Sequence, residues 1–186
     1  MAIKIYIDQG HNPENPNAGA EGNGLREQDI TYRVGAELAS LLRANPNYEV
    51  RLSRPTPETA LGTSNTTSLR ARVNDANAWG ADYFISIHTN ASSNPSANGI
   101  EAFAYSQPSR AFALGESILA SLSAATGQRN RGMKVRPGLY VLRRTAMPAI
   151  LLEIGFISNP EEAALMNQNP ALFARGIYNG IVADLG

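Results

Sequence analysis

Apolar positions along the chain follow two alternating patterns, short strand-like runs and longer stretches with helical spacing. Short runs rich in β-branched residues predict strands at residues 3–7, 48–52, 82–87, 100–105, 140–142 and 149–154. Apolar residues three and four positions apart predict helices over residues 29–42, 69–79, 111–126, 161–167 and 171–185. Strands that alternate with helices are typical of an α/β fold. We therefore expect residues 1–186 to form a single domain, with a mostly parallel twisted sheet and helices on both faces.

The ends of the predicted strands carry the two histidines of the chain. The strands at 82–87 and 149–154 are the most apolar, so we expect them at the buried centre of the sheet. In sheets of this kind, ligands bind beyond the carboxyl ends of the strands. His11 follows the first strand and His88 follows the strand at 82–87. Both histidines are therefore expected at the edge of the sheet where a site would form.

Composition narrows the possible partners and metal ligands of the protein. Sixteen basic residues balance 16 acidic ones, so charge favours neither nucleic acid nor an anionic membrane as a partner. The chain has no cysteine, so any metal must be bound through nitrogen and oxygen. No apolar run approaches the roughly 20 residues that span a bilayer, and the N-terminus has no signal-peptide pattern. We expect a monomer that does not insert into membranes, made in the cytoplasm and released by lysis, or a domain excised from a larger protein.

Two histidines at one sheet edge favour a metal site. A single histidine at a strand end is more often a hydrogen-bonded structural residue, but a chance pairing of His11 and His88 at the same edge is much rarer. Two histidines and one carboxylate form the ligand set of many hydrolytic zinc sites. Three protein ligands leave one position for water, whose pKa the metal lowers to about 7.

The loop before the first predicted helix offers the carboxylate. Glu27 opens that helix, where packing would fix its position, whereas Glu14 and Glu21 lie in Gly- and Pro-rich sequence and would be less rigid ligands. Asp29 is also available. Spacing alone leaves a second interpretation of Glu27, as an acidic residue stabilised by the dipole at a helix N-terminus.

Glu153 stands alone among apolar residues in the strand at 149–154. An unpaired ionised carboxylate is expensive to bury. Glu153 is therefore either paired, for instance with an arginine, or placed at the edge of a site with a shifted pKa. Beside an activated water it could act as the general base and then protonate the leaving amine.

These residues belong to a longer set of motifs. The chain resembles the catalytic domain of the zinc-dependent N-acetylmuramoyl-L-alanine amidases from Ile3 nearly to the C-terminus. The resemblance is carried by DQGH (8–11), GLRE (24–27), SLRARVNDANAWGADYFISIHTNA (68–91), GIEAFAY (99–105) and LYVLRRTAMPAILLEIGFISNPEE (139–162). The order and spacing of these motifs are specific, although GIE and LRE are weak when taken singly.

The resemblance implies a parallel-rich α/β fold and one Zn²⁺ per chain, bound by His11, Glu27 and His88. It implies that Glu153 transfers protons during hydrolysis of the amide between the lactyl group of N-acetylmuramic acid and L-alanine. Peptidoglycan would be the substrate, and the enzyme would act at the cell wall as an autolysin or endolysin.

This sequence departs from the family pattern after the first histidine, where Asn12-Pro13 replaces the usual glycines. Between His88 and Gly99 lies only a short polar loop, without the long helix that blocks the site in some relatives. Other functions remain open: a zinc peptidase acting on other peptides, or a non-catalytic wall-binding relative. A nucleotide-binding domain is disfavoured because Gly10-His11-Asn12-Pro13 fits neither phosphate-loop pattern.

Overall fold

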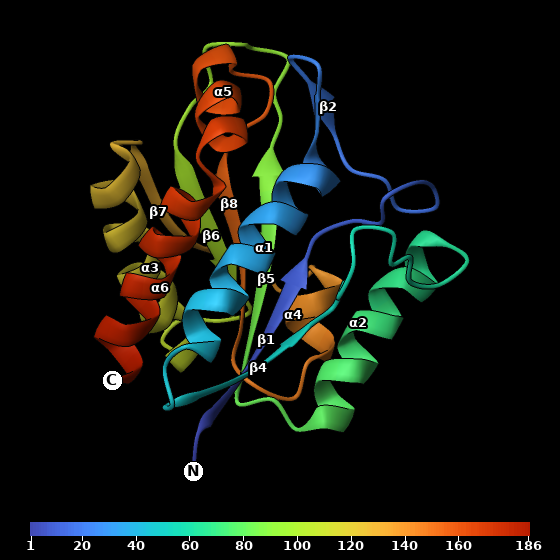
Figure 1. The fold of residues 1–186 in the computed structure, drawn as a ribbon, viewed down its shortest axis with the longest axis vertical. Coiled ribbons are helices and arrows are strands. Elements are labelled where there is room, and N and C mark those ends of the chain that lie inside the picture. Colours follow the sequence, from blue (N-terminus) through green and yellow to red (C-terminus); the bar gives the residue numbers. More distant parts are fainter.

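A six-stranded sheet runs through the middle of the molecule in the computed structural model, which describes residues 1–186 (Figure 1). Its strands, in spatial order, are β4 (Tyr48–Leu52), β1 (Ile3–Gln9), β5 (Tyr83–Asn90), β8 (Ala149–Phe156), β6 (Ile100–Ala104) and β7 (Asn130–Val135). Neighbouring strands are parallel except at the β8–β6 pair. The predicted α/β fold with a mostly parallel sheet is confirmed.

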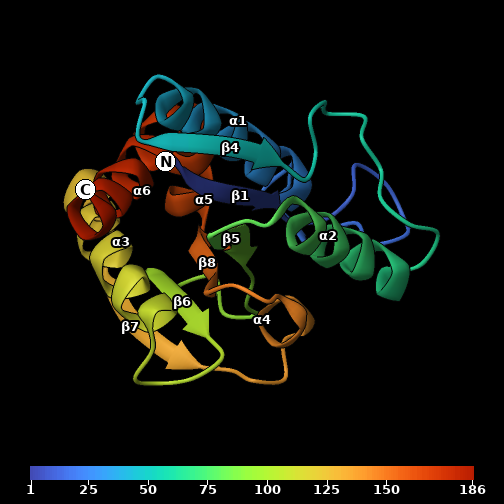
Figure 2. The same cartoon turned by 90° about the horizontal axis from the view of Figure 1, so that it is seen from below.

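Helices cover both faces of the sheet, as Figure 2 shows in a view from below. One face is covered by α1 (Glu27–Arg43), α3 (Arg110–Thr126), α5 (Pro160–Gln168) and α6 (Pro170–Leu185). The opposite face carries α2 (Asn65–Trp79) and α4 (Tyr140–Arg144). The first layer encloses a core cluster of 30 buried residues and the second a cluster of 10. No helix is both long and apolar enough to cross a membrane.

Local sequence sets the limits of α2, the helix that carries the buried Arg72. Ser64 accepts a hydrogen bond from the backbone N–H of Thr67, and the Thr67 hydroxyl accepts from the Ser64 backbone N–H. This capping box satisfies donors that the first turn leaves free. The helix ends at Gly80, whose φ of 68° is easy for a residue without a side chain.

Two sequence predictions were wrong. Residues 140–142 were expected to form a strand, but they open the helix α4. So short an apolar run fits a helical turn as well as a strand, and Val141 and Leu142 are buried in the smaller core while Arg143 and Arg144 are exposed. His88 was expected just past its strand, but it lies within β5, which continues to Asn90.

Three strands were not predicted. β7 is an edge strand with the polar sequence NRGMKV; none of its residues is fully buried, so it carries no apolar pattern typical of a strand. β2 (Glu21–Gly22) and β3 (Leu25–Arg26) form a two-stranded antiparallel pair before α1. Each contains only two residues, too few for a periodic pattern.

Candidate metal and catalytic site

The side chains of His11, Glu27 and His88 meet at the carboxyl ends of β1 and β5. His11 Nε2 lies 3.2 Å from Glu27 Oε1, His88 Nδ1 lies 3.1 Å from the same oxygen, and the two ring nitrogens are 3.2 Å apart. In a tetrahedral zinc site with bonds of about 2.0–2.1 Å, ligand atoms stand about 3.3–3.4 Å apart. These three residues can therefore hold one metal ion.

Glu27 is fixed by backbone donors on two sides. It is the first residue of α1 and is only 3% exposed. Its Oε1 accepts from the N–H of Thr89 at 2.9 Å, and its Oε2 accepts from the N–H of Ala20 at 2.9 Å. Burial opposes ionisation, but hydrogen bonds from His11 and His88 outweigh it and hold the pKa of Glu27 below its usual range. The carboxylate is therefore charged and preorganised.

Two glycines leave room for the ligand side chains. A Cβ on Gly10 would lie 2.5 Å from the ring of His88, and one on Gly19 would lie 2.8 Å from Glu27 and 2.9 Å from His11. Neither position tolerates a side chain without moving a ligand. The close packing of backbone against these rings limits how far they can turn.

Glu153 stands next to this cluster, paired in register with His88 across β5 and β8. No arginine or lysine forms an ion pair with it, and its buried Oε2 has no hydrogen-bond partner. Burial raises the pKa of Glu153 to about 8, with the Glu27 and Glu101 carboxylates adding to the effect. The structural interpretation through an arginine pair is wrong.

A second carboxylate, Glu101 on β6, faces Glu153 across the antiparallel β8–β6 pair. It accepts a hydrogen bond from Asn90 at 2.8 Å and forms ion pairs with Arg131 and Lys134 on β7. Burial would raise the pKa of Glu101, but the Lys134 ammonium and the Arg131 guanidinium hold it below its usual range. Of two adjacent carboxyl groups, one is thus paired and charged while Glu153 is left free.

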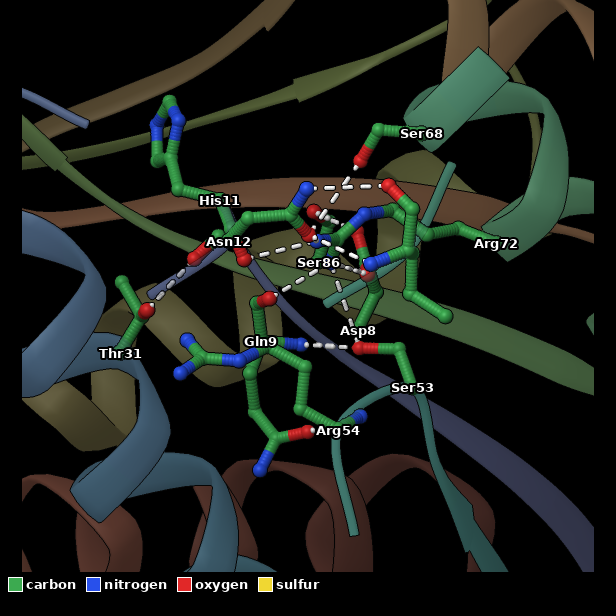
Figure 3. Close-up of polar contacts among 12 residues, drawn as sticks. Asp8, Gln9, His11, Asn12, Thr31, Ser53, Arg54, Ser68, Arg72 and Ser86 are labelled. Carbon is green, nitrogen blue, oxygen red and sulfur yellow. Dashed lines mark hydrogen bonds and ion pairs between the residues drawn. The ribbon is translucent and has the colours of Figure 1, made fainter. Parts of the chain in front are cut away.

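Sequence reasoning missed the polar residues beneath His11. Figure 3 shows Arg72 of α2 reaching the end of β1 and the turn that follows, among Asp8, His11 and Asn12. Arg72 is only 1% exposed. A signal was available in the sequence, because Arg72 lies four residues from both Ser68 and Ala76, on the stripe of α2 that faces the protein.

The site opens to solvent. The side chains of His11 and His88 are 21% and 18% exposed, while that of Glu27 is 5% exposed. A site that is open to solvent in this way can accept one bond of a long polymer.

Three side chains that can hold a metal ion at the end of a parallel-rich sheet, with an unpaired carboxyl group beside them, form an arrangement suited to hydrolysis. Comparisons with known proteins define the class. The family model for N-acetylmuramoyl-L-alanine amidases matches residues 5–183. The N-acetylmuramoyl-L-alanine amidase CwlM of Bacillus licheniformis is 37% identical over 187 residues, which cover 96% of this chain and 67% of CwlM.

Two further relatives support the match. The endolysin of Bacillus phage SPP1 is 32% identical over 193 residues, covering 100% of this chain and 67% of the endolysin. The catalytic domain of CwlV, an N-acetylmuramoyl-L-alanine amidase from Bacillus (Paenibacillus) polymyxa var. colistinus, superposes with a TM-score of 0.84 at 31% identity. That superposition covers 97% of both chains. The chain thus spans about two thirds of the length of its two sequence relatives, CwlM and the endolysin, and nearly all of the CwlV domain.

The chain belongs to the N-acetylmuramoyl-L-alanine amidase family. This membership confirms the family expected from the motifs, and with it the amidase activity on peptidoglycan. The same matches and the shared fold extend across the motifs that contain His11, Glu27, His88 and Glu153.

Proposed function

We propose that this amidase uses one zinc ion, held by His11, Glu27 and His88, to hydrolyse the amide between the lactyl group of N-acetylmuramic acid and L-alanine. The observation that carries the proposal is the spacing of the three ligand atoms, 3.1–3.2 Å around a common centre. Two neutral imidazoles and one carboxylate suit zinc and leave a fourth position open. Bound there, zinc would supply Lewis-acid activation of a water and of the scissile carbonyl.

Glu153 would carry the protons. Burial keeps the free carboxyl group weakly acidic, with a pKa of about 8, and no partner competes for its Oε2. As a carboxylate it can take the proton of the attacking water, and as an acid it can deliver that proton to the leaving amine nitrogen. A group with a pKa near neutral pH can perform both steps within one turnover.

The open site supports a polymeric substrate. The solvent-reaching edges of His11 and His88 lie on the surface, so a glycan strand with its peptide can lie across them. Peptidoglycan is the polymer implied by the family, and the cell wall is where such an enzyme would act. We further propose that residues 1–186 act as one catalytic domain, because the four residues gather on one six-stranded sheet. His88 and Glu153 lie on its strands, His11 follows β1, and Glu27 opens α1, which packs against that sheet.

Metal analysis tests the zinc proposal. Protein purified without chelator should contain one zinc per chain, and His11→Ala and His88→Ala should each lose most of it. Glu116→Gln, an exposed change on α3 away from the site, should keep the wild-type zinc content. Wild-type zinc content in both histidine variants would place the metal elsewhere and refute the proposed ligand set.

A further inference from the structure

The imidazole of His11 has no hydrogen-bond partner outside the three-residue cluster. Its Nε2 faces Glu27 and His88, while its Nδ1 is buried and unpartnered. Histidine ligands usually donate their second ring N–H to a carboxylate, a carbonyl or water, and that contact fixes the ring orientation. The orientation of His11 must therefore come from packing and from the backbone to which it is attached.

That backbone is held in an unfavourable conformation. His11 has a φ of 69°, in the left-handed region that crowds the Cβ of any residue except glycine. Such residues persist only where surrounding contacts determine the backbone, and they gather at functional sites. The contacts that hold residues 8–12 are therefore the ones that orient the ring of His11.

Arg72 supplies those contacts from α2. Its Nη2 donates to the carbonyl of His11 at 2.7 Å and to Asn12 Oδ1 at 3.1 Å. Its Nη1 donates to Asp8 Oδ1 at 2.7 Å and to the carbonyl of Gln9 at 2.7 Å. Its Nη1 also reaches Ser53 Oγ at 3.4 Å. One buried guanidinium thus binds five acceptors, four of them on residues 8–12, on both sides of His11 along the chain (Figure 3).

The same network reaches the strand of the second histidine. Asp8 Oδ2 accepts from the hydroxyl of Ser86 at 2.7 Å, and Ser86 lies two residues before His88 on β5. Burial opposes ionisation of Asp8, but the Arg72 guanidinium and the Ser86 hydroxyl hold its pKa below the usual range. Asp8 is therefore charged and keeps the guanidinium in place between β1, β5 and α2.

We infer that Arg72 is a positioning residue for the metal site, which sets the backbone of His11 so that its imidazole faces Glu27 and His88 before the metal binds. This inference rests on the proposed zinc function. Arg72 contacts none of the ligand atoms and is almost fully buried, so it acts through the backbone of His11 and, by way of Asp8 and Ser86, on the strand of His88. Its loss should weaken metal binding and not merely loosen the fold.

The main test is Arg72→Lys, with zinc affinity measured by competition against a chromogenic chelator. Lysine keeps the positive charge beside Asp8 but has a single nitrogen, so it cannot span both Asp8 and the His11 carbonyl as a planar fork does. Zinc should bind about 10–100-fold more weakly than to the wild type, the range found for changes to residues that orient metal ligands. Metal-free samples should be compared by thermal melting.

A second variant keeps the inference testable if the lysine variant does not fold. Asp8→Asn with Arg72→Met removes both charges of a buried pair, a replacement that folded proteins often tolerate. It should show the same loss of zinc affinity. Val73→Ala, a cavity-forming change at the neighbouring buried residue of α2, serves as control: it should lower the melting temperature and leave zinc affinity unchanged.

The outcomes separate the inference from the proposed function. A wild-type protein that binds no zinc would refute the proposed function itself. Wild-type protein that binds zinc, together with a folded Arg72 variant of equal zinc affinity, would overturn only the role of Arg72. A folded Arg72 variant that behaves like Val73→Ala, with a lower melting temperature and full zinc affinity, would show a purely structural arginine and would also overturn it.

Discussion

Glu153 and His88 are direct neighbours across the parallel pairing of β5 and β8. Side chains paired in this way point from the same face of the sheet, so the carboxyl group of Glu153 stands beside His88, one of the three proposed metal ligands. Both strands are central and buried, and groups carried by rigid strands keep their relative positions better than groups on loops. The fold therefore sets the distance between Glu153, the proposed proton-transfer residue, and the proposed metal site.

The first prediction concerns Glu153→Gln. The variant should fold, keep its zinc and lose activity by at least about 10²–10⁴-fold in kcat, because glutamine cannot accept or donate the proton. Steady-state turnover of purified peptidoglycan, together with metal analysis, measures both properties. A folded, zinc-loaded Glu153→Gln protein with nearly full activity would exclude the proposed role.

The second prediction concerns the stability of the metal-free protein. The pKa of Glu153 is raised to about 8 in the folded chain and should be about 4.3 when unfolded. Between these values the unfolded chain releases a proton that the folded chain retains, so this group stabilises the fold at low pH and the stabilisation fades as pH rises towards 8. Above pH 8 the buried carboxylate costs on the order of 3–5 kcal/mol relative to pH 4.

Glu153→Gln removes that cost. Denaturant unfolding of both metal-free proteins between pH 4 and 9 should give similar stabilities at pH 4 and a more stable variant at pH 9. Other groups that are not coupled to Glu153, such as Asp8, also titrate, but their contributions are common to both proteins and cancel in the difference. Parallel stability curves for the two proteins would show that Glu153 titrates normally.

The third prediction distinguishes Glu27 from Glu153. Glu27→Gln replaces one carboxylate oxygen by an NH₂ group, so the N–H of Ala20 or of Thr89 loses its acceptor. The substitution also replaces a charged ligand by a neutral amide. Zinc affinity should fall by at least about 100-fold, the upper end of what changes around the ligands cost. Chelator competition measures the loss, with Glu21→Gln, an exposed change in the preceding segment, as control.

Activity under excess zinc completes the comparison. High zinc should partly restore the Glu27 variant, whose defect is metal binding, and should leave the Glu153 variant inactive. Equal rescue of both variants, or of neither, would contradict the separate roles.

Sequence periodicity predicted most of the fold because the central strands and amphipathic helices are long. The two most apolar runs indicated the buried centre of the sheet, and they form β5 and β8, the strands that carry His88 and Glu153. Short or polar elements were not predictable in this way. β7 is polar and has no fully buried residue, and α4 has only five residues, too few to show a helical period.

The grouping of His11, Glu27 and His88 could be predicted because histidines are scarce and the motifs are specific, whereas the contacts that fix these side chains could not. Glu27 is held by backbone N–H groups of Ala20 and Thr89, and backbone donors leave no mark in a sequence. Arg72 is the intermediate case, since its position in α2 marks it as buried but its main partners, residues 8–12, lie 60 to 64 residues away and depend on the fold.

The most direct measurement of the central claim is mass spectrometry of purified peptidoglycan after digestion, with zinc-loaded enzyme, with protein shown by metal analysis to be zinc-free, and with that protein after zinc is restored. Zinc-loaded and restored enzyme should release stem peptides with a free L-alanine amino group and leave glycan strands with a free lactyl carboxylate. The zinc-free protein should release neither. The same products from zinc-free protein, or cleavage only at other bonds of the peptide, would contradict the account.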